Sequence, residues 1–170
     1  ESRTLDKVRE GHAFGAVSLH PQPLAGCCVD ELGEMNYLLT ASPAFVACHF
    51  PHGLTWEALA KAPAVAFDQR DDMHVSFMRE HFGLEPGGYP CHTVHSSEAF
   101  VAMAEQGLAY CLIPELQIRG QLAGGSLLNL SPDHVLTERL YWHRWVLEKG
   151  VHKQLSQRLI DHARSQLKPR

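Results

Sequence analysis

Residues 96–114 read SSEAFVAMAEQGLAYCLIP, and this stretch decides the fold class. Two serines and a glutamate stand at the start of a predicted short helix, Gly107 ends that helix, and an apolar strand follows. The preceding residues, CHTVH at 91–95, predict a strand that leads into the helix. The stretch therefore predicts one strand–helix–strand unit of an α/β protein.

The same alternation continues on both sides of this unit. PAVAF at 63–67 predicts a buried strand, and the next helix is expected to begin at Asp71 or Asp72 and to end at Gly83. After residue 114, ELQIRGQLAGG predicts a helix and SLLNLS a short strand. This order predicts an α/β fold with a mainly parallel sheet and helices on both faces.

The two ends of the chain are organised differently. A helix over residues 1–11 precedes the strand AFGAVSL at 13–19, and HPQPLAG at 20–26 has the proline and glycine content of a linker. CCVDELGEMNYLLTAS at 27–42 predicts a pair of strands that turns near Gly33. Near the other end, ERLYWHRWV at 138–146 predicts a long strand before an amphipathic terminal helix.

Composition limits the classes of function. The 170 residues suffice for one domain or two small lobes, 45% of them are hydrophobic, and the net charge is −4. A broad basic surface is therefore excluded, and we expect this chain alone not to bind DNA. We find neither an apolar run long enough for a membrane span nor a signal-like start, so a cytoplasmic location is expected. The chain starts without Met inside a helical pattern, which predicts a fragment.

Polar residues follow two of the predicted strands. Asp68 and Gln69 come directly after PAVAF, and Ser96 and Ser97 come directly after CHTVH. In open α/β sheets, ligands bind beyond the carboxyl ends of the strands, where helix N-termini offer free amides. The serines are also ordinary helix N-caps, whereas capping does not account for Asp68, which precedes its helix.

Signals for catalysis and for metals are weak. GxSxG, P-loop, GxGxxG and HExxH motifs are absent, and the five cysteines form no CxxC pair, which favours reduced thiols. Cys48, His49 and His52 in CHFPH have ligand-like spacing, but surface and packing roles are favoured. Trp142 and Trp145 are similarly interpreted as packing residues rather than a platform for bases. No cofactor and no metal is predicted.

SSEAFVAMAEQGLAYCLIPELQI resembles the effector-binding domain of LysR-type transcriptional regulators. GAVSLHPQPLAGC, LLTASPAFVACHFPHGLTWEALAKAPAVAFDQRDDMH and LYWHRW are similar to the branch of that family that includes ArgP, also called IciA, and LysG, whose members sense lysine and arginine. The resemblance covers essentially the whole chain.

This resemblance implies a periplasmic-binding-protein-like fold of two Rossmann-like subdomains, with the effector in the cleft between them. FGAVSL and ERLYWHRW would be the two crossover strands. Residues 20–135 would form the second subdomain, while 1–19 and 136–170 would form the remainder of the first. The first subdomain would be incomplete, lacking a strand–helix–strand segment, and the winged helix-turn-helix and linker helix would be missing. We therefore expect the chain to self-associate through an unpaired sheet edge, or its first subdomain to be poorly ordered.

The family also implies the site and the partners. Phe67, Asp68, Gln69, Ser96 and Ser97 match positions that line the effector site, and Ser2 and Thr4 match the opposite wall. The implied effector is L-lysine or L-arginine. DNA and RNA polymerase would be partners only of the full-length regulator, which is not an enzyme and does not bind membranes.

Two other classes of protein remain open from the residues alone. A periplasmic-type solute-binding protein for amino acids shares the two-lobed design, although the unpaired cysteines and the lack of a signal peptide disfavour it. A small α/β enzyme that uses a Cys and His pair would need an exposed thiol with a low pKa beside a histidine.

Overall fold

The computed structural model describes residues 2–67 and 72–169, which form two compact units. Unit 1 comprises Glu1–Met35 and Thr137–Arg170, and unit 2 comprises Asn36–Leu136. The boundaries between the two units therefore fall after residues 35 and 136. Each unit has its own strands, helices and buried core.

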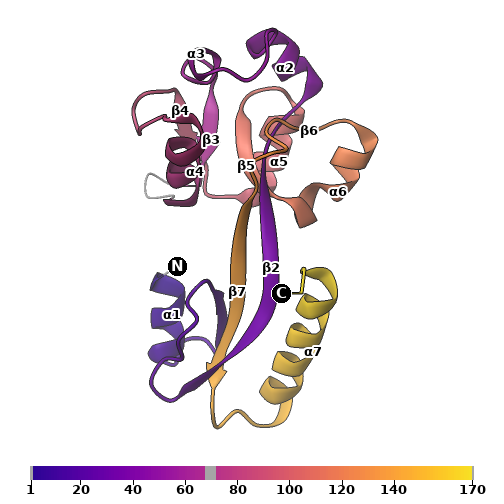
Figure 1. Cartoon of the computed structure of the whole chain (residues 1–170). Coiled ribbons are helices and arrows are strands. Elements are labelled where there is room, and N and C mark those ends of the chain that lie inside the picture. The colour runs from indigo at the N-terminus through magenta and orange to yellow at the C-terminus, as the bar shows by residue number, and fades with distance from the viewer. Residues whose placement is uncertain (1, 68–71, 170) are drawn as a thin grey trace. The chain divides into compact units, whose positions relative to one another are not determined.

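Unit 1 is a small sheet with one helix on each face. Its elements are α1 (Ser2–Arg9), β1 (Gly15–Ser18), the first part of β2 (Cys27–Ala41), most of β7 (Leu136–Trp145) and α7 (Gly150–Gln166) (Figure 1). The strand order is β1-β7-β2, and β1 pairs antiparallel with β7. Val8 of α1 packs with Ala16 and Cys27 on one face, whereas Ile160 of α7 packs with Leu32 and Trp142 on the other.

β2 is one strand of 15 residues, so the predicted turn near Gly33 is wrong. Gly33 lies inside the strand with a φ of 134°, and a Cβ there would lie 2.8 Å from Leu167 Cβ and 2.9 Å from the Lys168 carbonyl oxygen. Lys168 also exchanges two backbone hydrogen bonds with Glu34. The glycine therefore makes room for the C-terminal segment against the strand instead of turning the chain.

The strands that connect the two units are β2 and β7, because both cross the boundary between them. The prediction that FGAVSL is a crossover strand is wrong, since β1 has four residues and lies wholly in unit 1. Two prolines follow it in HPQPLAG, and proline cannot supply the amide hydrogen that a continuing strand needs. ERLYWHRW, in contrast, lies within β7 as predicted.

Unit 2 is an α/β layer structure with helices on both faces of its sheet. Its elements are the rest of β2, α2 (Pro43–His49), α3 (Trp56–Leu59), β3 (Ala64–Ala66), α4 (Asp72–Phe82), β4 (Cys91–Thr93), α5 (Ser97–Glu105), β5 (Tyr110–Pro114), α6 (Glu115–Gly124) and β6 (Leu128–Asn129) (Figure 1). β3 is parallel to both β4 and β5, whereas β2 is antiparallel to β5 and β6. The sheet is thus parallel only around β3, and not over most of its strands as predicted.

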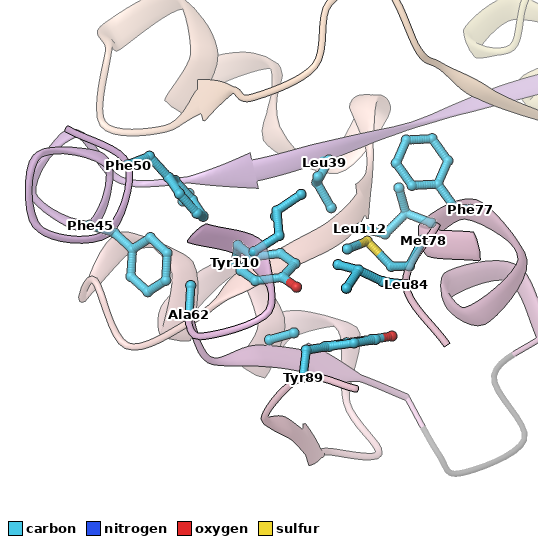
Figure 2. Close-up of a cluster of buried hydrophobic side chains, with 13 residues drawn as sticks. Leu39, Phe45, Phe50, Ala62, Phe77, Met78, Leu84, Tyr89, Tyr110 and Leu112 are labelled. Atoms are coloured by element: carbon cyan, nitrogen blue, oxygen red, sulfur yellow. The ribbon is translucent and has the colours of Figure 1, made fainter. Parts of the chain in front are cut away.

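Alternation along the strands divides the core of unit 2 into two clusters. Tyr110 and Leu112 of β5 face Phe45 of α2 and Phe77 of α4 (Figure 2). Cys111 and Ile113, the intervening residues, belong to the second cluster, which includes α5 and α6 side chains. Successive side chains of a strand point to opposite faces, so both faces of β5 are covered by helices.

Tyr110 brings a hydroxyl group into the first cluster. Figure 2 shows its ring among labelled apolar side chains, and its hydroxyl has no hydrogen-bond partner in the described part of the chain. Burial raises the pKa of Tyr110, so the phenol stays neutral. A buried hydroxyl without a partner typically destabilises a fold by about 1–3 kcal/mol.

We therefore expect Tyr110→Phe to leave the free energy of unfolding unchanged or to raise it by about 1 kcal/mol. Urea denaturation followed by circular dichroism measures this effect. Thr40→Val is the matched control, because the buried Thr40 hydroxyl donates a 3.3 Å hydrogen bond to the Cys111 carbonyl oxygen and its removal should destabilise the fold. If Tyr110→Phe loses as much stability as Thr40→Val, then the Tyr110 hydroxyl does make a hydrogen bond in the folded protein.

Candidate effector site

The carboxyl ends of β3 and β4 meet at one edge of the unit 2 sheet. The two strands are parallel, with Ala64 opposite Cys91 and Ala66 opposite Thr93. One further hydrogen bond, 3.0 Å from the Val94 N–H to the Ala66 carbonyl oxygen, continues this register past both strand ends. The segment after β3 therefore begins beside the segment that leads into α5.

Phe67 is the first residue after β3, and its side chain lies against two rings. The Phe67 and His95 ring centroids are 5.7 Å apart, with the ring planes at 89°. The Phe67 and Phe100 centroids are 6.5 Å apart, at 66°. Phe100 is buried in the second core cluster, whereas Phe67 is 46% exposed. The three rings thus extend from the core of unit 2 to its surface.

Ser96 caps the N-terminus of α5. Its hydroxyl oxygen accepts a 3.3 Å hydrogen bond from the Ala99 N–H, and its O–H donates a 2.9 Å bond to the Glu98 carboxylate. Capping satisfies one of the amides that a helix start leaves unpaired. Both serine hydroxyls interact with Glu98, but Ser96 is also the helix cap, so the hydroxyl of Ser97 is the better candidate to bind a ligand carboxylate.

Glu98 places a negative charge at this helix start. Its own backbone N–H, and then the hydroxyls of Ser96 and Ser97, lower the pKa of the Glu98 carboxyl. A lowered pKa keeps the group ionised at neutral pH, where it interacts favourably with the N-terminal end of the helix dipole. An anionic ligand at the same position would have to compete with this carboxylate.

Of the five predicted site residues, the structure brings Phe67, Ser96 and Ser97 to the same sheet edge. Asp68 and Gln69, and also Asp71, lie outside the described residues, while Asp72 begins α4 as predicted. Ser2 and Thr4, expected on the opposite wall, belong to α1 of unit 1. Phe67, Ser96 and Ser97 thus follow the two strands whose carboxyl ends the register of β3 and β4 brings together.

The sequence did not indicate His95 as part of this site. A histidine at the end of CHTVH has no local signal for a ring contact, and only the register of β3 with β4 places it beside Phe67. Glu98 was noted as polar, but its bond with the Ser96 hydroxyl was not predicted. One signal in the sequence could have suggested this hydrogen bond, because a serine and a glutamate stand two positions apart at a helix start.

The described residues offer little for catalysis or for a metal. Among them, no group of three or more His, Cys, Asp and Glu side chains could hold a metal ion. His49 packs against Phe45, with ring centroids 4.3 Å apart, and Trp142 is buried against α7. Burial raises the pKa of the Cys27 and Cys111 thiols, which is opposite to the change that activates a nucleophile. In residues 2–67 and 72–169, no helix is long and apolar enough to span a bilayer.

Sequence comparison connects this chain with regulators. The model of the LysR substrate binding domain matches residues 1–168. The HTH-type transcriptional regulator ArgP of Aeromonas salmonicida is 82% identical over 169 residues, which are 99% of this chain and 56% of that protein. ArgP of Sodalis glossinidius is 49% identical over 168 residues, or 99% of this chain and 57% of that protein. The chain thus spans little more than half the length of these relatives.

Solved structures agree with the sequence comparison. The C-terminal domains of a LysR family protein from Agrobacterium tumefaciens match with a TM-score of 0.91 and 35% identity, over 100% of this chain and 82% of that one. ArgP from Mycobacterium tuberculosis matches with a TM-score of 0.88 and 33% identity, over 99% and 58% of the two chains. Full-length LysG from Corynebacterium glutamicum with bound effector Arg matches with a TM-score of 0.87 and 30% identity, over 99% and 57%.

These matches confirm the predicted α/β, periplasmic-binding-protein-like fold class and the resemblance to the ArgP and LysG branch. The two ArgP relatives from sequence comparison and LysG are transcriptional regulators by name. The alternative of a periplasmic solute-binding protein therefore receives no support from them. This chain belongs to the LysR substrate binding domain family.

Proposed function

We propose that this chain is the effector-sensing part of a LysR-type transcriptional regulator and that it binds a basic amino acid, L-arginine or L-lysine. The observation that carries this proposal is the 82% identity to an ArgP regulator over almost the whole chain. LysG, solved with bound effector Arg, supports the chemical class of the ligand. The polar residues that follow β3 and β4 are the side chains that we assign to this task.

A basic amino acid needs groups of both signs from its site. The ligand carboxylate would accept hydrogen bonds from the Ser97 hydroxyl and from backbone N–H groups at the start of α5. Asp68, Gln69 and Phe67 would bind the ligand from the segment that follows β3, with Asp68 as the partner of a ligand cation.

Regulation would require more than this domain. We propose that effector binding changes how the full-length regulator binds DNA and contacts RNA polymerase in the cytoplasm, and that effector domains self-associate. DNA binding and polymerase contact would belong to the part of the relatives that this chain does not match, since it covers 56% of the Aeromonas protein.

Isothermal titration calorimetry tests the ligand class. The protein is titrated separately with arginine, lysine, ornithine and norleucine, a neutral amino acid of similar length. We expect heat of binding with at least one of the basic amino acids and none with norleucine. Equal affinity for norleucine, or silence toward all four ligands, would contradict the proposed function.

Substitution of the two serines separates capping from ligand binding. Ser96→Ala should destabilise unit 2 by about 1 kcal/mol, because the Ala99 N–H loses its cap. Ser97→Ala should leave stability nearly unchanged and weaken binding of the basic amino acid less than tenfold, because backbone amides still face the carboxylate. Urea denaturation and calorimetry of both variants measure the two effects. If the two variants are equally stable and Ser96→Ala loses more ligand affinity than Ser97→Ala, then Ser96 and not Ser97 is the ligand-binding serine.

A further inference from the structure

The ring of Phe67 lies at the edge of the unit 2 sheet and packs against the rings of Phe100 and His95. Phe100 is buried in α5, and its ring centroid is 6.5 Å from that of Phe67. The ring centroid of His95 is 5.7 Å from that of Phe67, and the two ring planes are at 89° to each other. Perpendicular packing at this distance is a preferred geometry for aromatic pairs, so His95 limits the orientations that the Phe67 ring can adopt.

Phe67 nevertheless keeps a large exposed surface. Phe67 is 46% exposed, although it directly follows the buried strand residues Ala64, Val65 and Ala66. The negative face of an aromatic ring attracts a cation that approaches it. The Phe67 ring lies beside the start of α5, where the ligand carboxylate is proposed to bind. A basic amino acid also carries a cation at the far end of its side chain.

Arginine and lysine differ in how well they use an aromatic face. The guanidinium group is planar, delocalised and weakly hydrated, so it stacks on a ring at a small cost in hydration. The ammonium group of lysine is compact and strongly hydrated, so it loses more solvation when it leaves water for the same surface. An exposed ring of fixed orientation therefore discriminates between the two amino acids.

We propose that Phe67 is the surface on which the guanidinium of arginine stacks, and that His95 is a positioning residue that orients the Phe67 ring and so favours arginine over lysine. The inference rests on the proposed function and adds the preferred effector and the residue pair that selects it. It depends on described side chains only, independently of Asp68 and Gln69.

Calorimetric titration of the parent and of four variants with arginine and with lysine tests the inference. Phe67→Leu keeps an apolar side chain but removes the aromatic face, and should weaken arginine binding about tenfold, or about 1.4 kcal/mol. Lysine binding should weaken less than about threefold. His95→Ala should reduce the ratio of arginine to lysine affinity about threefold, and His95→Phe, which retains a ring, should restore it.

His92→Ala is the matched control, since His92 is an exposed histidine on β4, three residues before His95, and should leave both affinities unchanged. A merely structural role of His95 would lower both affinities by the same factor and would overturn the inference. A parent that binds both amino acids but prefers lysine, or an unchanged ratio in Phe67→Leu, would also overturn it while leaving the proposed function intact. A parent that binds neither amino acid would overturn both.

Discussion

Asp68→Asn is expected to weaken the binding of arginine and lysine about tenfold to a hundredfold, while the protein remains folded. Asparagine retains the size of aspartate and a hydrogen-bonding oxygen but loses the negative charge. A partly desolvated, charge-assisted hydrogen bond contributes about 1.5–3 kcal/mol, and about 1.4 kcal/mol corresponds to one decade of affinity. Calorimetry with both amino acids measures the change.

Asp133→Asn provides a control of the same chemistry, because Asp133 is an exposed residue of unit 2 in the segment between β6 and β7. This variant loses one negative charge and should bind both amino acids as tightly as the parent. If Asp68→Asn also binds them with parental affinity, Asp68 is not the partner of the ligand cation. Asp71, Asp72 and Glu98 would then be the acidic residues to substitute next.

The largest expected effect on stability is that of Gly15→Ala. A Cβ on Gly15 would lie 2.3 Å from Cζ2 of Trp142 and 2.8 Å from the carbonyl oxygen of His143. The indole cannot move easily, because Trp142 is buried and its Nε1–H donates a 3.0 Å hydrogen bond to the Ser156 hydroxyl. We expect a loss of about 3 kcal/mol in the free energy of unfolding, at the upper end of overpacking effects.

Gly120→Ala is the opposite case and serves as the control. Gly120 lies in α6, two residues after a kink at Ile118, and a Cβ there would meet no atom within 4 Å apart from its chain neighbours and the backbone of its own helix. Alanine loses less conformational entropy than glycine when a helix forms, so the substitution should stabilise unit 2 by about 0.5–1 kcal/mol. Urea denaturation followed by tryptophan fluorescence and circular dichroism compares the two variants. If Gly15→Ala is as stable as the parent, then the Trp142 ring does not lie as close to Gly15 of β1 as described.

Local pattern determined most of unit 2. Ser96 as a helix start, Gly107 after the helix and the apolar run that becomes β5 are signals within a few residues of one another, and α5 and β5 form where they predict. These elements follow from capping, backbone freedom and periodicity, which act over one or two helical turns. The edge of the sheet that carries Phe67, Ser96 and Ser97 followed from the same alternation, because parallel strands end on the same side.

Tertiary structure alone decided the features that depend on segments distant in the chain. Gly33 suggests a turn in the sequence, but the approach of Leu167 and Lys168 keeps it inside a continuous strand. The identity of the crossover strands likewise depends on which strands run from one unit into the other, and β2 and β7 do so whereas β1 does not. The contact between Phe67 and His95 exists because β3 and β4 align in one register, and no local preference of either residue encodes that alignment. Sequence thus specified the elements and the polar ends of the strands, whereas packing between distant segments determined which side chains meet there.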